Sequence, residues 1–429
     1  MRIGLIGRNT TEYAERLFRI WNSGDSAVLI DCDAPPSVSF GLLKEAEACK
    51  CYLENSLADR YDDTAPPSFE ITCYPTEYRM PCVLPESLRE LYKPRYDESE
   101  AVVMYSSGTT GKRKGVSLSH RALSNNADSI IDYMRPTEND CLYLNKKLSH
   151  CSSLVGELLV ALKSGADILL SPLAVPPRIA FRNITDFNVT VLCCNPVLLK
   201  LYTEEAERTH SFPPSVRKVY TSGDFASEKE IERARKSFGC PVYNVYGQSE
   251  CGPRISAQTE KHCSGNSVGR PIRNVEVRTD GSGEILVKTD ALFSGYINSA
   301  SVIRHDGWHR TGDLGFFDGN GELHVTGRKD NMLISDAHNV YPEEIERDIT
   351  DNTLIDDCLV YTEGGRLVCD YVSKAEIDCT AVIRSLKQQL LPYEIPKAFR
   401  KVNSIPRNAN GKKTRKHDIA ETEDNEDIV

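Results

Sequence analysis

Residues 101–115 read Ala-Val-Val-Met-Tyr-Ser-Ser-Gly-Thr-Thr-Gly-Lys-Arg-Lys-Gly, an apolar run that passes directly into a turn rich in glycine and hydroxyl groups. The apolar run at 101–104 predicts a buried strand. Its following turn offers many N–H and O–H donors, and glycines there permit positive φ and close approach of a ligand. Such a loop suits a polyphosphate, with Lys112 and Lys114 supplying positive charge. It is not a Walker loop, because Gly108 and Gly111 are too close together and Arg113 follows Lys112.

Strands and helices alternate on both sides of this loop. Residues 3–6 and 27–30 are short apolar runs around a helix-like stretch at 10–21, and this βαβ unit is closed by a turn at Pro35-Pro36. Strands are expected again at 168–170 and 189–193, and a charged helix at 228–238. The pattern predicts an α/β fold with a large N-terminal domain of parallel sheets.

The character of the chain changes from about residue 268. Short strands between glycine turns, at 275–278, 284–287 and 323–325, predict a β-rich subdomain over about 268–328. An α+β section follows, with helices near 342–349 and 381–391. We therefore expect a large core over 1–328 and a small C-terminal domain over 329–429.

Composition and charge exclude several classes of protein. The net charge of −10 argues against a nucleic-acid or anionic-membrane surface as the main partner. No apolar run is long enough to span a bilayer. The fifteen cysteines are odd in number, and no secretory signal precedes them, so reduced thiols in the cytoplasm are expected. Zinc is not indicated, because no Cys-x-x-Cys pair occurs.

Four further motifs follow the glycine-rich loop along the chain. They are Val245-Tyr246-Gly247-Gln248-Ser249-Glu250, Trp308-His309-Arg310-Thr311-Gly312-Asp313, Thr326-Gly327-Arg328-Lys329-Asp330 and Ile405-Pro406-Arg407-Asn408-Ala409-Asn410-Gly411-Lys412. Each alone is an ordinary turn or a solvated basic stretch. Together, and in this order, they resemble the adenylate-forming superfamily of acyl- and aryl-CoA synthetases, luciferases and nonribosomal-peptide adenylation domains. Arg113 stands where that family's glycine-rich loop has proline.

The resemblance implies a role for each motif. Residues expected to bind ATP are Ser106, Ser107, Gly108, Thr109, Thr110, Gly111, Lys114, Tyr246, Gly247, Ser249, Asp313 and Arg328. Glu250 would hold Mg²⁺ together with phosphate oxygens, as that ion prefers, and Asp313 would accept hydrogen bonds from the ribose hydroxyls. Asp330 would be the hinge of a mobile C-terminal lid. Lys412, the implied catalytic lysine, would stabilise charge that develops in the transition state, with Glu250 and Lys114 also implied as catalytic.

The acid-binding pocket is expected around His150, Ser222, Gly223 and Asp224. His150 stands where amino-acid-activating members carry aspartate, which disfavours an α-amino acid as substrate. It resembles the gate histidine of acyl- and aryl-CoA synthetases; a lone histidine is otherwise often structural. Asp224 departs from the family's small residues there and would hydrogen-bond adenine or a polar substrate group.

The resemblance therefore implies an ATP- and Mg-dependent ligase that converts a carboxylic acid, aryl or fatty, to acyl-AMP and passes the acyl group to a thiol. The thiol is that of CoA or of a carrier-protein phosphopantetheine. Asp336-Ala337 replaces the family's Gly-Gly beside the pantetheine arm, so an amine acceptor stays open. A non-catalytic nucleotide-binding descendant also stays open, although Lys114, Glu250, Asp313, Arg328 and Lys412 are all present. Members usually carry tens of residues before the point where this chain starts.

Overall fold

The first sheet is built from the N-terminal third of the chain and carries the start of the glycine-rich loop. The computed structural model describes residues 1–61, 69–76, 81–106, 113–172, 175–297, 306–335, 338–364, 366–408 and 411–415. Its first sheet has the order β17-β7-β6-β2-β1-β3-β4. These strands are β1 (Arg2–Ile6), β2 (Ser26–Ile30), β3 (Lys50–Glu54), β4 (Glu70–Tyr74), β6 (Glu100–Ser106), β7 (Lys114–Ser119) and β17 (Gly295–Tyr296). Strands β4, β3, β1, β2 and β6 run parallel, while β7 is antiparallel to both of its neighbours, β6 and β17.

Helix α1 (Thr11–Asn22) joins β1 to β2 as the sequence predicts. The Thr10 hydroxyl caps it by accepting from the Tyr13 N–H. Its apolar face, with Leu17 and Phe18 both wholly buried, packs into the main core, and each such side chain contributes about 2 kcal/mol. Helix α2 (Pro36–Glu45) follows where only a turn was expected, because Pro36 has the φ that the first residue of a helix needs and no N–H to lose there.

The second sheet is also mainly parallel, with the order β14-β13-β12-β11-β10-β8-β9-β5. Its strands are β5 (Cys82–Val83), β8 (Cys141–Leu144), β9 (Asp167–Leu170), β10 (Val191–Cys194), β11 (Lys218–Thr221), β12 (Val242–Tyr246), β13 (Ser256–Ala257) and β14 (Arg270–Pro271). The core between the two sheets contains α1, α4 (His120–Met134), a π-helix (Leu154–Leu159) and α6 (Val160–Ser164). Helices α7 (Pro177–Asp186), α8 (Pro196–Thr209) and α9 (Glu228–Phe238) cover the other face of the second sheet.

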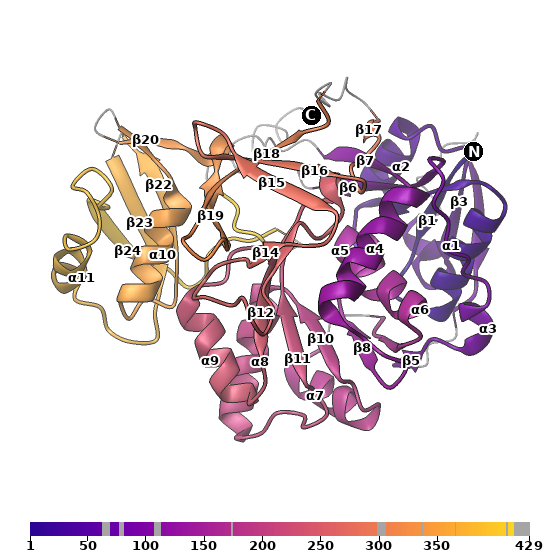
Figure 1. Cartoon of the computed structure of the whole chain (residues 1–429), viewed down its shortest axis with the longest axis horizontal. Helices are drawn as coiled ribbons and strands as arrows, with labels where there is room; N and C mark the ends of the chain where they lie inside the picture. The colour runs from indigo at the N-terminus through magenta and orange to yellow at the C-terminus, as the bar shows by residue number, and fades with distance from the viewer. Residues whose placement is uncertain are drawn as a thin grey trace.

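A third, antiparallel sheet of order β15-β16-β18-β19 lies beside the ends of the first two (Figure 1). Its strands are β15 (Val275–Thr279), β16 (Glu284–Thr289), β18 (His309–Phe317) and β19 (Leu323–Arg328). These four strands fall within the range expected to be β-rich. The remaining short elements of the core are α3 (Glu86–Arg89), α5 (Cys151–Ser153) and the 3₁₀ turns η1 (Asn55–Arg60), η3 (Ser249–Cys251) and η4 (Lys329–Asn331).

The C-terminal section has two small sheets, β20-β21 and β22-β23-β24, and its own core, and it lies at the left of Figure 1. It contains β20 (Leu333–Ser335), β21 (His338–Val340), α10 (Pro342–Asn352), β22 (Asp357–Glu363), β23 (Arg366–Val372), α11 (Cys379–Leu386) and β24 (Ala398–Lys401). Helix α11 is shorter than the predicted 381–391. Only Val382 and Leu386 are buried on it, and i→i+3 bonds at Gln388 and Gln389 turn the chain away.

The predicted α/β fold with parallel sheets is confirmed, and a separate β-rich sheet accompanies it. The exact boundary at 328/329 stays a prediction. All fifteen cysteines are free. Within the described residues, no helix is both long and apolar enough to cross a bilayer.

Candidate functional site

The carboxyl ends of the parallel strands of the second sheet meet at one edge, and the predicted residues follow these strand ends. Ser222 and Gly223 come after β11, and Gly247 to Glu250 come after β12. Strand β11 lies between β10 and β12 with all three parallel, so their loops emerge side by side. This edge is where α/β sheets usually bind ligands.

Asp313 is the centre of one group of contacts at this edge. Its Oδ2 accepts from the Tyr246 hydroxyl at 2.6 Å and from the Gln248 amide at 2.5 Å, while its Oδ1 accepts from Arg328 Nη1 at 3.0 Å. Asp313 and Arg328 face each other in the β18–β19 ladder. Burial and the Asp313 carboxylate raise the pKa of Tyr246 well above its usual value, so the hydroxyl stays protonated and donates.

Glu250 is the centre of a second group. Its Oε1 accepts from the Tyr296 hydroxyl at 2.8 Å, and its backbone carbonyl accepts from the Phe293 N–H at 2.8 Å. The Lys114 ammonium lies 5.3 Å from the centre of the Tyr296 ring, within cation–π range. Burial, with Glu250 next, raises the pKa of Tyr296, so this hydroxyl also donates. Tyr296 therefore contacts Glu250 through its hydroxyl and Lys114 through its ring.

His309 links the two groups. Burial lowers the pKa of this imidazole, and the carboxylates of Glu250 and Asp313 both oppose that shift, so both lie close enough to act on the ring. Its ring also packs edge-on against Phe293, with centroids 5.4 Å apart. Of these two carboxylates, Glu250 is the one expected to hold Mg²⁺ together with phosphate oxygens, the ligand set that this ion prefers.

Gly247 allows the backbone turn that holds Glu250 in position. A Cβ at this position would lie 2.2 Å from the carbonyl oxygen of Pro253, so only glycine permits the backbone to fold back on itself. Ile255 N–H then donates to the Tyr246 carbonyl at 2.7 Å and closes the turn. The segment between these two residues is a compact loop that presents Ser249 and Glu250 at the sheet edge.

His150 lies close to Lys412 at the same edge, where the structure brings the core and the C-terminal section together. The pKa of His150 is lowered to about 4, chiefly by burial. The Asp31 carboxylate opposes that shift, and the ammonium groups of Lys147, Lys146 and Lys412 add to it. Lys147 is itself held by Asp31 at 2.6 Å. At neutral pH the imidazole is therefore uncharged.

Asp224 is a contact between the core and the C-terminal section. Its Oδ2 lies 3.7 Å from Nη1 of Arg407. That arginine also donates to Asp357 at 2.6 Å and to the Gly411 carbonyl at 2.8 Å. The acidic side chain that departs from the family pattern thus faces the turn that carries Lys412, rather than standing alone beside the predicted pocket residues Ser222 and Gly223.

Lys412 sits at the tip of a tight turn. Gly411 has φ +81°, a conformation that favours glycine, and its N–H donates to the Asn408 carbonyl at 2.9 Å. Lys412 is exposed, whereas Lys413 and Arg415 on the following strand-like residues point inward. Both of these donate to Glu346 at 2.9 Å. The buried cations fix the register of the turn, so that Lys412 points outward.

Asp330 lies in η4, directly after the third sheet. Its Oδ2 is 3.5 Å from Nη2 of Arg328, the residue that also contacts Asp313. Whether this position acts as a hinge stays a prediction.

Part of the predicted phosphate loop lies outside the described residues, namely Ser107, Gly108, Thr109, Thr110 and Gly111. Ser106 is described as the last residue of β6 and pairs with Lys114 on β7, which places the two ends of the loop together. Asp336 and Ala337 also lie outside the description.

Three residues of this region escaped the sequence analysis as site residues. Gln248 lies within a recognised motif, but no pattern showed that its amide reaches Asp313. Tyr296 and Arg407 approach the site from segments far along the chain. The only signal for Arg407 was its place in the turn before Lys412.

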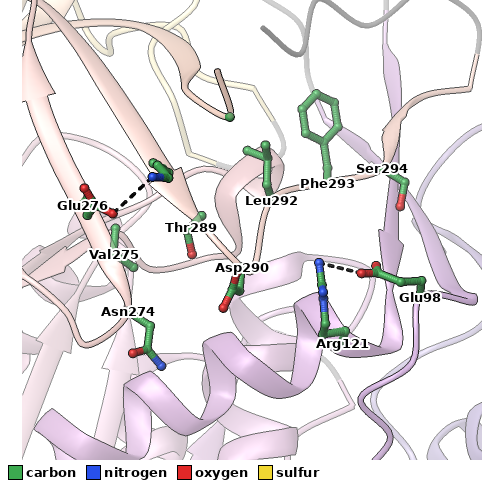
Figure 2. A pocket seen from close by; sticks show the side chains of 12 residues that line it. Glu98, Arg121, Asn274, Val275, Glu276, Thr289, Asp290, Leu292, Phe293 and Ser294 are labelled. Carbon is green, nitrogen blue, oxygen red and sulfur yellow. Dashed lines mark ion pairs between the residues drawn. The ribbon is translucent and has the colours of Figure 1, made fainter. Parts of the chain in front are cut away.

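A cavity of about 670 Å³ opens on the other side of this region, between the start of α4 and the third sheet (Figure 2). Ion pairs line it, including Arg121 with Glu98 at 2.5 Å. It shares Phe293 with the Glu250 group, but among the residues described none of the predicted site residues lines it. We therefore assign the chemistry to the sheet edge and not to this cavity.

Comparisons with known proteins show the family of the chain and the proteins that share its fold. A family model described as AMP-binding enzyme matches residues 2–297. An indoleacetate–CoA ligase of Aromatoleum aromaticum is 30% identical over 347 residues, which are 75% of this chain and 67% of that enzyme. The chain spans about two thirds of the length of the curated relatives it matches.

Solved structures share the fold. ATP-bound MatB from Rhodopseudomonas palustris has a TM-score of 0.84 at 23% identity, covering 99% of this chain and 89% of that one. MenE, the o-succinylbenzoate coenzyme A synthetase of Bacillus subtilis, in complex with ATP and magnesium ion, has a TM-score of 0.78 at 23% identity. That match covers 96% of this chain and 88% of MenE.

Proposed function

The chain belongs to the AMP-binding enzyme family, and from that membership we propose that it activates a carboxylic acid with ATP as acyl-AMP and then passes the acyl group to a thiol. The observation that supports the proposal is the convergence of Tyr246, Glu250 and Asp313 at one sheet edge, and the turn that carries Lys412 approaches the core through the contact of Arg407 with Asp224. These groups match the needs of one nucleotide and one carboxylate.

Each group has a proposed role in holding ATP. The Asp313 carboxylate, oriented by Gln248 and Arg328, would accept from the ribose hydroxyls. The Tyr246 ring would lie against adenine. Lys114, at the end of the glycine-rich loop, would pair with the departing phosphates. Magnesium would be held by Glu250 and phosphate oxygens, and it would neutralise phosphate charge when bound.

In the first step an oxygen of the substrate carboxylate attacks the α-phosphorus of ATP. The bond from that phosphorus to the bridging oxygen breaks, pyrophosphate leaves, and acyl-AMP remains. Positioning and charge stabilisation supply most of the catalysis in such a transfer. The Lys412 ammonium would stabilise the negative charge that develops between the two reactants, which is worth about 3–4 kcal/mol for one preorganised group.

In the second step a thiol attacks the acyl carbonyl, loses its proton, and releases AMP. We propose that the C-terminal section, residues 329–429, turns about Asp330 to withdraw Lys412 and admit the thiol, as lid motions do in many enzymes. CoA is the acceptor that the curated relatives' names favour. A carrier-protein phosphopantetheine is the second thiol, and an amine is the alternative acceptor.

The acid is proposed to be an aryl or fatty acid and not an α-amino acid. The neutral imidazole of His150 offers no negative charge for a substrate ammonium group. The related indoleacetate–CoA ligase is named for an aryl acid. We place the enzyme in the cytoplasm, where its free cysteines stay reduced.

ATP–pyrophosphate exchange tests this proposal. Purified protein is incubated with ATP, labelled pyrophosphate and a panel of aryl, fatty and amino acids, with magnesium and with EDTA. We expect exchange with at least one aryl or fatty acid, lost in EDTA, and none with amino acids. Absence of exchange with every acid, while the protein still binds ATP, would contradict the proposal and favour a non-catalytic nucleotide-binding protein.

A further inference from the structure

A buried cluster of charges lies at the same sheet edge and has no role in the steps above. Arg254 is only 1% exposed, and Glu157 is fully buried on the π-helix. Lys146, just after β8, lies 2.6 Å from Glu157. Lys146 and Arg254 both act on Glu157, so two cations share this one buried carboxylate, and among the described residues Arg254 has no carboxylate within ion-pair distance. An uncompensated buried charge is costly, and proteins keep one where it serves a purpose.

The guanidinium of Arg254 lacks partners for most of its donors. Nη1 donates to the carbonyl of the adjacent Pro253 at 2.8 Å. Within the part of the chain that the structure describes, its buried Nε and Nη2 have no well-aligned acceptor, and the Tyr133 hydroxyl is a buried polar neighbour of the guanidinium. A buried guanidinium loses the hydration of each N–H donor and regains nothing where the donor finds no acceptor. An acceptor supplied from outside the protein would recover that energy.

The fold holds Arg254 firmly in this position. It ends the compact loop that begins at Gly247 and carries Glu250, and Asn126 of α4 donates to its backbone carbonyl at 2.9 Å. The guanidinium lies against Gly156, where a Cβ would be 3.2 Å from Nη2. Gly156 belongs to a π-helix, an irregularity that is frequent at functional sites.

Arg254 also lies near the residues that follow His150, a predicted residue of the acid-binding pocket. Cys151 directly follows His150, and its thiol has a pKa raised to about 12 by burial, which the Arg254 guanidinium partly offsets. The Ser153 hydroxyl, on the next turn, is fully buried and has no hydrogen-bond partner among the described residues. Buried polar atoms without a partner among the described residues are therefore found both on Arg254 and on the turn that follows His150.

We propose that Arg254 forms a cationic end of the acid-binding pocket and that the preferred substrate carries a second carboxylate at the end opposite the one that is activated. This inference rests on the proposed function and narrows its substrate class. The second carboxylate accepts from Nε and Nη2 of Arg254 in the two-pronged geometry that suits guanidinium groups. Lys146 and Glu157 stay paired beneath it.

Matched acids test the inference. Pyrophosphate exchange is measured with pairs that differ only in the second carboxylate, adipate against hexanoate and terephthalate against benzoate. We expect the wild type to favour the diacid of at least one pair by about 100-fold or more in kcat/KM, because a site built for a polar group rejects the analogue that lacks it.

Arg254→Met removes the cation and keeps an unbranched side chain that fills the space of the arginine stem. It should fold with an unchanged or higher melting temperature, since Lys146 and Glu157 remain as a neutral pair. The ratio of kcat/KM for the diacid to kcat/KM for the monoacid should fall by about 100-fold. Arg19→Met, at an exposed arginine of α1, is the control and should leave the preference unchanged. Arg254→Lys should restore part of the preference.

The outcomes separate the two proposals. Exchange with monoacids but not with diacids, or an unchanged preference in Arg254→Met, would overturn the inference and leave the proposed function standing. A large drop in melting temperature with no change in preference would show that Arg254 only supports the fold. Exchange with no acid at all would overturn the proposed function and this inference together.

Discussion

Individual side chains at the site were partly predictable from the sequence. Tyr246, Glu250, Asp313 and Arg328 stand in short motifs whose residue types suit a nucleotide and a metal ion, and the fold brings them to one edge. Arg254 was not predictable. It is a single arginine after a turn, and its burial depends on a π-helix about a hundred residues earlier in the chain.

The buried histidine His120 allows a test by pH at the level of a single residue. His120 is 5% exposed, and its pKa is lowered to about 4 by burial first and by the Arg95 guanidinium, against the opposing Asp97 carboxylate. Between about pH 6.5 and pH 4 the unfolded chain holds a proton on this imidazole and the native protein does not. The stability that the neutral imidazole contributes is complete above the unfolded pKa, and is lost as pH falls toward 4.

For His120 the loss amounts to about 3 kcal/mol in the free energy of unfolding. Urea unfolding of the wild type and of His120→Gln at several pH values between 4 and 7 measures it. The variant should show a shallower decline on the acid side, while His150, whose pKa is lowered in the same direction, keeps part of the slope. Parallel curves for the two proteins would contradict the assignment of a neutral, buried His120.

Single elements show where sequence patterns suffice and where they fail. Helix α9 has the bounds that were predicted, because Ser227 and Glu230 form a capping box at its start and Gly239 adopts a left-handed conformation at its end. Helix α2 was missed, because Pro35-Pro36 signals a turn as strongly as it signals a helix start. Local residues determine where a helix begins and ends. Whether a proline pair forms a turn or starts a helix depends instead on how the following residues pack.

The turn that carries Lys412 is anchored by one buried carboxylate of α10. Glu346 accepts from Lys413, from Arg415 and from the Val360 N–H. Glu346→Gln leaves two largely buried cations without this partner, and we expect a loss of about 3 kcal/mol in the free energy of unfolding. Exchange activity should also fall, because the register of Lys412 depends on this anchor. Thermal melting and pyrophosphate exchange measure the two effects.

Glu276→Gln is the matched control, since Glu276 pairs with Lys288 on the surface of the third sheet. It should change the free energy of unfolding by less than about 0.5 kcal/mol. Equal stability for the Glu346 and Glu276 variants would mean that the C-terminal turn is held by other contacts.

At the scale of the whole molecule, several polar contacts join the core to the C-terminal section among the described residues. Arg407 lies near Asp224, Lys374 pairs with Glu204 at 2.9 Å, and the Lys229 ammonium donates to the Thr353 carbonyl at 3.0 Å. Polar contacts of this kind are cheap to break, and relative motion of such units is the default expectation. The sequence predicted two units, but not which charges join them.

We propose that the C-terminal section brings Lys412 to the nucleotide site and that this lysine acts in the first step and not in the second. The most direct test compares wild type, Lys412→Ala and Lys401→Ala, an exposed lysine on the same section, in two separate assays. One is ATP–pyrophosphate exchange with the best acid, and the other is transfer from supplied acyl-AMP to CoA. Lys412→Ala should lose about 100- to 1,000-fold in exchange, keep the wild-type Kd for ATP and keep the transfer rate, while Lys401→Ala matches wild type throughout. Exchange by Lys412→Ala at the wild-type rate would contradict the account.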